Sequence, residues 1–417
     1  MTKQISKEKY DLIVIGGGPS GMMAAGTAAS NQKKVLLIEK NNELGKKLKI
    51  SGGGRCNITN AIFDHKIFLK KFGIAEKFLY STFSQFDVKD TFSFFESRGL
   101  PLVTEENNRV FPQTQKALDV FDIMKKYISN KNIEILTNNL VLKINTSKDN
   151  IISIETKKGI FIADKYIIAT GGLSHPETGS TGDGFKWLKD MGHTSKVSSP
   201  NIVPLKVSDK WVKNLSGTSL SNMKITFYVN KKKSFSETGK ILFTYFGISG
   251  PLILNLSQRV HDIFHEGSVT AEIDCFPDQD LGTLEKNIIK IFDENKNKSF
   301  KNIAKEIIPI GLSSALLDLE VIEDINTKVN NITKENRKVI VRLLKALPMT
   351  IVGLMGMDRA VISSGGIPLT EVDTKTMKSK LFKNLYLTGD ILDINRPSGG
   401  FSLQLCWTTG YVAGLLK

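Results

Sequence analysis

The sequence predicts an α/β protein with a doubly wound sheet that is built from both ends of the chain and interrupted by inserted segments. Two observations predict this class. Residues 10–40 read as a short apolar strand, a glycine-rich turn, a helix of small residues and a second apolar strand ("YDLIVIGGG", "GMMAAGTAAS", "KVLLIEK"), which together form a βαβ unit. Near the other end, "LYLTGD" at residues 385–390 restores a buried strand followed by Gly-Asp.

The middle of the chain changes character along its length. Residues 64–130 are mainly helical, and five short β-rich runs follow ("IEIL", "LVLKI", "IISIET", "IFIA", "KYIIAT"), which predict a small meander feeding a last buried strand. Further short strands with Gly and Ser turns precede a Lys-, Asn-, Glu- and Ile-rich stretch with helical periods. We therefore expect four segments: the first part of a nucleotide-binding domain at 1–195, an inserted β domain at 196–280, a helical subdomain at 281–347, and the second part of the nucleotide-binding domain at 348–417.

The formal net charge is +15 and the pI is near 9.4, which would suit a nucleic-acid partner. The dense lysine runs are short, however, and no arginine-rich stretch interleaved with aromatic residues is present. The sequence therefore favours a lysine-rich surface over a nucleic-acid groove.

Three cysteines, Cys56, Cys275 and Cys406, lie far apart and form no CxxC pair. We expect no disulfide framework, no metal site and a reducing, cytoplasmic location. Residues 12–30 and 397–416 carry no charge, but glycines and a proline interrupt each stretch. We therefore expect buried helix entries there rather than membrane spans.

The first glycine cluster has the pattern G-x-G-x-x-G, formed by Gly16, Gly18 and Gly21 between a strand and a helix. Gly16 allows the tight turn, Gly18 lets the backbone approach a pyrophosphate, and Gly21 allows close packing of helix and strand. The helix N-terminus then offers free N–H groups and a positive dipole end to the phosphates. Glu39, 23 residues after Gly16, is placed to bind ribose hydroxyls.

NAD and FAD are both bound by this unit of strand, glycine turn and helix. The motifs further along the chain favour FAD. Asp390, after the strand in "LTGD", is a candidate to hold a ribityl hydroxyl. The segment 397–414 begins a helix at a Gly-Gly pair, which would set a positive dipole end against the pyrimidine edge of a flavin. The "IIATGG" strand at 167–172 ends in small residues that leave room for a dinucleotide. No second G-x-G-x-x-G follows a strand, so we expect no dedicated NAD(P)H domain.

The second glycine cluster, "KKLKISGGGRCNITN" at 46–60, follows the second strand, where the chain should return toward the cofactor. Its three glycines allow the backbone to run along a flat or charged ligand. We expect Arg55 and Lys47 to contact the pyrophosphate, and Cys56 and Asn57 to lie near the isoalloxazine. Inert packing is favoured for Cys56 over a redox role, because no CxxC partner exists. A mobile loop that binds a substrate phosphate is the alternative for the glycines.

Several motifs resemble those of the BaiN/YhiN-like family of bacterial FAD-dependent oxidoreductases. They are "GGGPSGMMAA", "GKKLKISGGGRCNITN", "NNRVFPQTQKALDV", "ATGGLSHPETGSTGDGF", "LFTYFGISGPLILNLS", "AVISSGGIPLTEVDTKTM" and "LYLTGDILDINRPSGGFSLQ". The resemblance implies a Rossmann-like FAD-binding domain of the glutathione-reductase type (three-layer ββα), an inserted β-barrel-like domain and a helical subdomain. Members of the family are associated with reduction of C=C bonds next to a carbonyl in steroid-like acids, and others with amine oxidation.

The motifs together give a set of residues expected to contact FAD. They are Gly16, Gly18, Pro19, Ser20, Gly21, Glu39, Lys40, Lys47, Gly52, Gly53, Gly54, Arg55, Cys56, Asn57, Val141, Thr170, Gly171, Gly172, Gly389, Asp390, Gly399, Gly400, Phe401 and Ser402. The chain departs from the family pattern at Phe401 and Ser402, where "GGFSLQ" stands in place of "GGYNLQ", and at Asp390, where a glutamate is usual. These departures bear on the substrate more than on FAD.

The sequence thus predicts an FAD-dependent oxidoreductase that transfers a hydride between flavin N5 and a small organic substrate, with NAD(P)H as a transient donor. Candidate catalytic residues are Tyr245 and His175 as proton donors and Arg109 as an anchor for an anion, although packing or surface roles account equally well for them. The alternatives are a flavin-dependent tRNA-modifying enzyme and a flavin-binding protein without turnover. The sequence does not indicate an oligomeric state.

Overall fold

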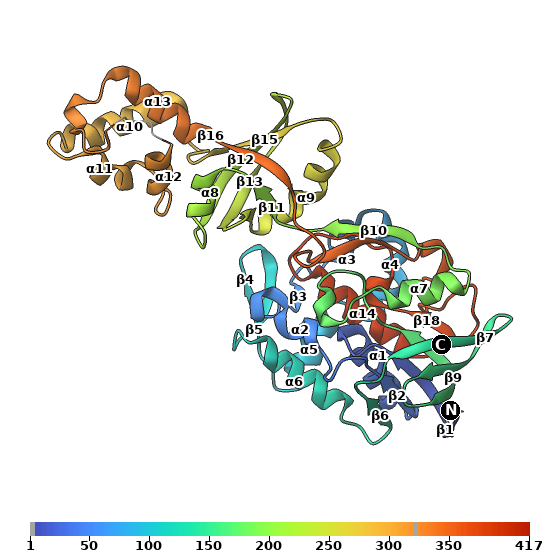
Figure 1. Ribbon diagram of the computed structural model, residues 1–417. Helices are drawn as coiled ribbons and strands as arrows, with labels where there is room; N and C mark the ends of the chain where they lie inside the picture. The colour runs from blue at the N-terminus through green and yellow to red at the C-terminus, as the bar shows by residue number, and fades with distance from the viewer. Residues whose placement is uncertain (1–4, 320–323) are drawn as a thin grey trace. The chain divides into compact units, whose positions relative to one another are not determined.

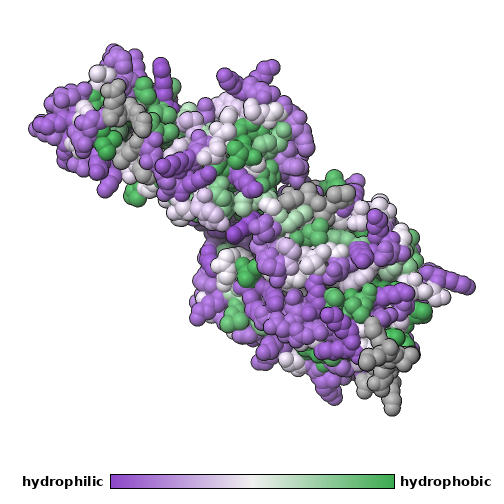
Figure 2. Space-filling model, viewed as in Figure 1, coloured by the Kyte–Doolittle hydropathy of each residue, from purple (hydrophilic) through white to green (hydrophobic). Residues whose placement is uncertain are grey.

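The computed structural model describes residues 5–319 and 324–417, which divide into two compact units. Unit 1 comprises residues 1–200 and 360–417, and unit 2 comprises residues 201–359. Both chain ends therefore belong to unit 1 (Figure 1). Each unit has its own hydrophobic core, and on the face seen in Figure 2 hydrophilic residues cover most of each surface, with smaller hydrophobic patches between them.

A seven-stranded sheet forms the centre of unit 1, in the order β6-β2-β1-β9-β8-β7 with β18 also paired to β9. Its strands are β1 (Ile5–Ile15), β2 (Val35–Ile38), β6 (Ile133–Leu136), β7 (Val141–Ser147), β8 (Asn150–Thr156), β9 (Ile160–Ile168) and β18 (Leu385–Leu387). The neighbours β6, β2, β1, β9 and β18 pair in parallel, with Val14 opposite both Leu37 and Ile167. The predicted Rossmann-type α/β class is thereby confirmed. The run "IEIL" differs from expectation, since β6 extends the parallel edge beside β2 while only β7, β8 and β9 form the meander.

Two helices from opposite ends of the chain pack against one another in unit 1, α1 (Pro19–Ser30) and α14 (Phe401–Gly414) (Figure 1). A Cβ atom on Gly410 would lie 2.4 Å from the Ser20 carbonyl oxygen, and one on Gly414 would lie 2.6 Å from that of Ala24. The two backbones therefore touch at positions where a side chain has no room. Helix α6 (Ala117–Ile128) also packs closely on α1, with the ring of Tyr127 against Gly26.

The remaining elements of unit 1 are short. They are α2 (Lys46–Ile50), α3 (His65–Leu69), α4 (Glu76–Phe83), α5 (Val88–Glu96), α7 (Asp183–Asp190), the small sheet of β3 (Thr59–Asn60), β5 (Arg109–Pro112) and β4 (Leu102–Glu105), and the pair β10 (Lys196–Asn201) and β17 (Ile362–Gly366). Helix α5 begins at a capping box, because the Asp87 and Asp90 carboxylates each accept a hydrogen bond from the other's backbone N–H.

Unit 2 is a closed barrel with a helical segment inserted before its last strand. The barrel order is β11 (Leu205–Val207), β14 (Gly247–Ser249), β13 (Lys232–Thr244), β12 (Ser219–Val229), β15 (Val269–Asp274) and β16 (Leu347–Leu354). The helices are α8 (Lys210–Asn214), α9 (Pro251–Ile263), α10 (Leu281–Glu294), α11 (Phe300–Ile307), α12 (Ser313–Asp318) and α13 (Lys334–Lys345). Side chains such as Ile225 and Phe227 fill the core, as the alternation along β12 requires.

The start of the last segment differs from the sequence-based boundary at residue 348. Strand β16 pairs with both β11 and β15 and so completes the barrel, and unit 2 continues to Arg359. Among the described residues, no helix is long and apolar enough to cross a membrane. No group of His, Cys, Asp and Glu side chains within those same ranges is arranged to hold a metal ion.

We predict that Gly410→Ala destabilises the protein, because the new methyl group must displace the backbone of α1. Overpacking of this kind costs roughly 1–3 kcal/mol, which outweighs the gain in helix propensity of up to about 1 kcal/mol. The matched control is Gly282→Ala in α10, where the nearest atom would be 3.5 Å away. Thermal unfolding should show a lower midpoint for Gly410→Ala and a neutral or slightly raised midpoint for the control. Equal midpoints would contradict the close packing of the two helices.

Candidate cofactor site

A groove lies at the carboxyl ends of β1, β2 and β9, where the sequence analysis expects a dinucleotide. Its lining residues come from the glycine turn, the end of β2, the β6–β7 connection and the segment after β9. They are Ile15, Gly16, Gly18, Ile38, Glu39, Lys40, Asn41, Asn139, Leu140, Val141, Ala169, Thr170, Thr178, Gly179, Ser180, Thr181, Asp183 and Trp187. Segments far apart in sequence thus contribute to one concave surface.

The three glycines of the first cluster have three different environments. Gly16 has φ +108°, and a Cβ there would lie 2.5 Å from the Ala169 carbonyl oxygen. A Cβ on Gly21 would lie 1.9 Å from the Gly16 carbonyl oxygen, whereas one on Gly18 would meet nothing within 4 Å. Gly21 therefore serves packing of the helix on the strand, and Gly18 presents bare backbone to open space. Helix α1 begins there with Pro19 in its first turn and no side-chain cap.

Glu39 holds a fixed position at the end of β2. Its carboxylate accepts hydrogen bonds from the backbone N–H groups of Gly17 and Asn41, each at 2.8 Å, and the residue is buried. These bonds fix the carboxylate at the edge of the groove, where it can accept hydrogen bonds from the hydroxyl groups of a ribose.

Buried polar atoms without hydrogen-bond partners test whether the groove fits a polar ligand. Asn139 Nδ2 and Thr170 Oγ1 both belong to groove residues, are buried, and have no hydrogen-bond partner among the described residues. Leaving such an atom unsatisfied costs about 1–3 kcal/mol, so a polar ligand that pairs with them is favoured. Together with the bare backbone at Gly18, these atoms fit an FAD dinucleotide, which carries hydroxyl, phosphate and ring-nitrogen groups.

The segment 174–183 forms one wall of the groove and is held by three side chains that follow β2. Lys40 pairs with Asp183 at 2.7 Å and also donates to Thr181, and Asn41 donates to the Thr178 carbonyl oxygen at 2.9 Å. Lys47 donates to the Ser174 carbonyl oxygen at 2.7 Å and to Ser180 Oγ at 2.8 Å. Burial lowers the pKa of the Lys47 ammonium, and the nearby Asp390 carboxylate opposes that shift. The pyrophosphate role expected for Lys47 and the FAD contact expected for Lys40 stay predictions.

The second glycine cluster forms a single turn of 3₁₀ helix at Ser51–Gly54 with φ angles of +57°, +68° and +86° at its glycines. A Cβ on Gly53 or Gly54 would meet nothing within 4 Å, so the backbone faces open space. Arg55 pairs with Glu105, donates to Gln115 at 2.6 Å and stacks over Phe111. Its guanidinium is therefore already engaged, and its contact with a pyrophosphate stays a prediction.

The residues that follow this turn bind the start of α14. Trp407 Nε1 donates to the Ile58 carbonyl oxygen at 3.0 Å, and Thr59 Oγ1 donates to Gln404 Oε1 at 2.6 Å. Asn60 Nδ2 donates to the Gly399 carbonyl oxygen at 3.0 Å. Gly400 is in the left-handed region with φ +101°, and a Cβ there would lie 2.1 Å from the Thr59 carbonyl oxygen. The second glycine cluster is thus joined to the C-terminal helix over its first two turns.

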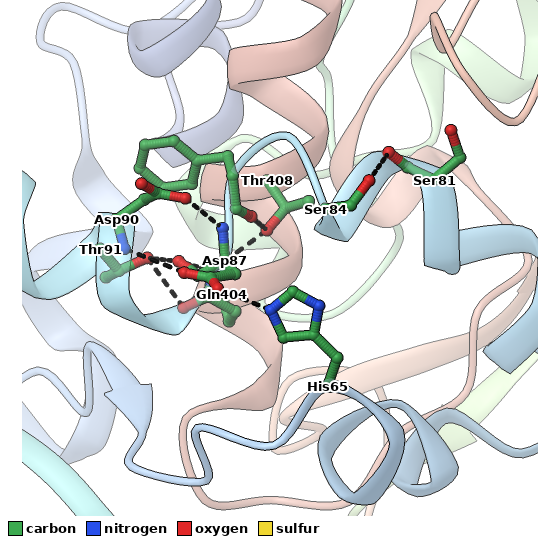
Figure 3. A network of polar contacts seen from close by, with 9 residues as sticks. His65, Ser81, Ser84, Asp87, Asp90, Thr91, Gln404 and Thr408 are labelled. Atoms are coloured by element: carbon green, nitrogen blue, oxygen red, sulfur yellow. Dashed lines mark hydrogen bonds and ion pairs between the residues drawn. The ribbon is translucent and has the colours of Figure 1, made fainter.

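Gln404 is the centre of this connection, and Figure 3 shows it pointing from α14 toward the start of α5. Its Oε1 accepts from Thr59 and Thr91, and its Nε2 donates to the Asp87 carbonyl oxygen and to Thr408 Oγ1. The side chain is 1% exposed, and these four bonds satisfy both of its ends. His65 completes the network, with Nε2 2.6 Å from Asp87 Oδ2 (Figure 3).

The C-terminal site residues form a second cluster. Asp390 pairs with the buried Arg396, which also donates to Ser402 Oγ at 3.1 Å and to the Ile394 carbonyl oxygen at 2.8 Å. Phe401 is buried, with its ring centroid 5.0 Å from that of Phe68. Phe401 therefore packs in the core, and the ribityl role expected for Asp390 stays a prediction.

Three close approaches account for Gly171, Gly172 and Gly389 of the expected set. A Cβ on Gly171 would lie 2.9 Å from Ser180 Oγ, one on Gly172 would lie 2.3 Å from Ser363 Oγ, and one on Gly389 would lie 2.8 Å from Ser20 Oγ. At these positions the small residue leaves room for protein atoms, so their direct contact with FAD is not needed to explain them.

The three candidate catalytic residues have different surroundings. In unit 1, Arg109 donates to the Glu106 carbonyl oxygen at 3.2 Å, and His175 has Nδ1 2.8 Å from Glu177 Oε1. In unit 2, Tyr245 is 64% exposed in the turn between β13 and β14 and accepts from Arg359 at 3.4 Å. Their catalytic roles stay predictions.

Sequence reasoning missed several residues of the site. Asn41, Asn139 and Trp187 line the groove, and Arg396 pairs with Asp390. The signal for Arg396 was available, because it is the charged residue directly before the uncharged stretch 397–416. Asn139 carried no such signal, since only the pairing of β6 with β2 brings it to the groove.

Comparison with known proteins gives full-length similarities. The family described as "HI0933-like protein Rossmann domain" matches residues 10–416. A 3-dehydro-bile acid delta(4,6)-reductase from Clostridium scindens is 28% identical, with 96% of this chain and 97% of that protein covered. A ribosomal RNA dihydrouridine synthase from Escherichia coli is 25% identical, with 97% of each covered. The structure of a 3-ketosteroid-delta4-(5alpha)-dehydrogenase from Rhodococcus jostii has the same fold, with a TM-score of 0.54, 12% identity, and 98% and 96% of the two chains covered.

We predict that two alanine substitutions in the first glycine cluster affect different properties, one the stability of the protein and the other its affinity for FAD. Gly21→Ala should lower the unfolding midpoint, because its methyl group collides with the Gly16 carbonyl group. Gly18→Ala should leave the midpoint of the FAD-free protein nearly unchanged, since its backbone is extended and the methyl group has space. The same methyl group should weaken FAD binding at least about tenfold by occupying the approach to the backbone. Unchanged FAD affinity in Gly18→Ala, measured by titration, would contradict the assignment of the groove.

We also predict that the three thiols are inert in the folded protein. Burial raises the pKa of Cys56, Cys275 and Cys406 to about 12, so that only about one part in ten thousand is thiolate at pH 8. A chromogenic thiol reagent should therefore react slowly with the native protein, and quickly with three equivalents after denaturation. Rapid reaction of Cys56 in the native state would instead support a redox role.

Proposed function

This chain belongs to the HI0933-like Rossmann family, whose members are flavin-dependent oxidoreductases, and we propose that it reduces a C=C bond conjugated to a carbonyl group, with FAD as cofactor. The observation that carries this proposal is a shared chemistry between two full-length relatives. A 3-dehydro-bile acid with delta-4 and delta-6 double bonds contains a C=C bond conjugated to a ketone. Uridine, which becomes dihydrouridine, contains one conjugated to a ring carbonyl. We favour a small organic enone as the substrate.

Different residues of unit 1 are suited to bind different parts of FAD. Bound FAD would supply the redox chemistry, a hydride at N5 of its reduced ring. The bare backbone at Gly18 and the uncapped start of α1 are suited to the diphosphate, and Glu39 to a ribose. The uncapped start of α14, after Gly400, is suited to the partial negative charge of a reduced pyrimidine edge.

Reduction of a conjugated C=C bond also needs a proton at the carbon next to the carbonyl group. His175 is the candidate donor in unit 1, since its pairing with Glu177 orients the ring. Arg109 would orient an anionic group of the substrate. Tyr245 is the candidate proton donor in unit 2. NAD(P)H would bind transiently as the electron donor, because the sequence offers no second dinucleotide cradle.

A uracil base in ribosomal RNA is the second candidate substrate. The net charge of +15 favours it, because a polyanion binds a basic protein through its phosphates. The dihydrouridine synthase from Escherichia coli matches this chain over its whole length at an identity only slightly below that of the bile-acid enzyme. A small enone and a uracil base demand the same electron transfer, so one experiment separates them.

We predict that the FAD-loaded protein, reduced anaerobically, is reoxidised by a 3-keto-4-ene steroid at least about tenfold faster than by the corresponding saturated ketone. Recovery of flavin absorbance at about 450 nm is the measurement. His175→Asn should slow this step by roughly 10²–10⁴-fold if it donates the proton, while FAD affinity stays the same. Reoxidation by a uridine-containing ribosomal RNA transcript alone would favour the second candidate. Reoxidation by neither substrate would contradict the proposed reaction, and failure to bind FAD would contradict the proposed cofactor.

A further inference from the structure

Hydrogen bonds hold the side-chain amide of Asn60 in one orientation and leave its oxygen without a partner among the described residues. Asn60 Nδ2 donates to two carbonyl oxygens, those of Asn107 and Gly399, each at 3.0 Å. A flipped amide would set Oδ1 against both carbonyl oxygens, so the donor end must face them. Asn60 Oδ1 is buried, in a residue only 3% exposed, and has no hydrogen-bond partner in the described part of the chain. The residue therefore offers one free acceptor at a fixed place.

The Asn60 side chain contacts the segment that precedes an uncapped helix. The same Asn60 side chain bonds Gly399, the residue before the N-cap of α14, and a Cβ on Gly400 would lie 2.9 Å from the Asn60 backbone nitrogen. Helix α14 is 14 residues long and has no side-chain cap, so its first N–H groups are open to a ligand. A residue with a buried free acceptor thus contacts the segment from which the uncapped helix α14 begins.

A buried acceptor without a partner costs about as much as a lost hydrogen bond, and native proteins contain few of them. The contrast with Gln404, three residues into the same helix and bonded at both ends, shows that the fold can satisfy buried amides in this region. No described residue supplies the donor that Asn60 Oδ1 lacks. A ligand with an N–H donor between acceptor groups would match both this oxygen and the helix N–H groups.

We propose that Asn60 Oδ1 accepts the N3–H of the flavin isoalloxazine, while the first N–H groups of α14 bind a carbonyl oxygen next to N3. The imide edge of the ring has this pattern, a single N–H donor between two carbonyl acceptors. The proposal deepens the proposed function and rests on FAD being the cofactor. It makes Asn60, a residue outside the set expected from the sequence, a determinant of how the ring is oriented.

The test compares FAD with FAD methylated at N3, which has lost the donor. In the unsubstituted protein we expect methylation to weaken binding at least about tenfold, since it leaves a buried acceptor unpaired. In Asn60→Ala, FAD itself should bind more weakly, and the penalty for methylation should fall to within about threefold. Dissociation constants from flavin fluorescence or calorimetry are the readout, with no turnover required.

Asn139→Ala is the matched control. Asn139 also has an unpaired buried amide atom, but it lines the groove beside Glu39 and the glycine turn. This variant should weaken FAD and N3-methyl FAD alike and keep the full penalty for methylation. If Asn60→Ala does not fold, Asn60→Ser retains a small donor toward Gly399 and takes its place.

Equal affinity for the two cofactors in the unsubstituted protein would overturn the proposal while leaving the proposed function intact. An undiminished methylation penalty in the folded Asn60 variant would overturn it as well. Failure of FAD itself to bind would instead show that the proposed function is wrong.

Discussion

The contact between α1 and α14 is the constraint on which unit 1 depends. Glycines at 410 and 414 let the backbone of the last helix touch that of the first, at Ser20 and Ala24. Both helices begin without a side-chain cap, at Gly18 and at Gly400. Because the two are packed directly together, their free N-terminal N–H groups are held in a fixed relation, which is what a ligand with a diphosphate at one place and a polar ring edge at another requires.

The second glycine cluster has a structural role that its composition alone does not suggest. Its glycines adopt left-handed turns and face open space, but the residues after them bind α14 through Ile58, Thr59 and Asn60. Gln404 then extends this connection to the capped start of α5. Direct hydrogen bonds therefore hold a segment near residue 60 and another near residue 400 together.

We take satisfied polar groups as residues that hold the fold, and unsatisfied buried groups as candidates for contact with a ligand. Gln404 makes four hydrogen bonds within the protein and belongs to the first class. Asn60, Asn139 and Thr170 each keep an unpaired buried atom and belong to the second. The distinction has an energetic basis, since each unpaired atom costs about 1–3 kcal/mol until a partner arrives. Arg55 and Phe401, which the motifs placed among the cofactor contacts, also contact protein neighbours, and their contacts with FAD stay predictions.

The sequence by itself determined the βαβ unit, the tight turn at Gly16, the close packing at Gly21 and the place of Glu39 at the end of the second strand, because each follows from spacing within some 25 residues. Tertiary structure decided the rest. The run at 133–136 joined the parallel edge beside β2, and β16 closed a barrel begun some 140 residues earlier. Neither could be read from the sequence, because periodicity reports which face of a strand is buried but not which strand lies beside it. The partners of Arg55 and Asn60 were hidden for the same reason: a hydrogen bond across 50 or 339 residues leaves no local pattern.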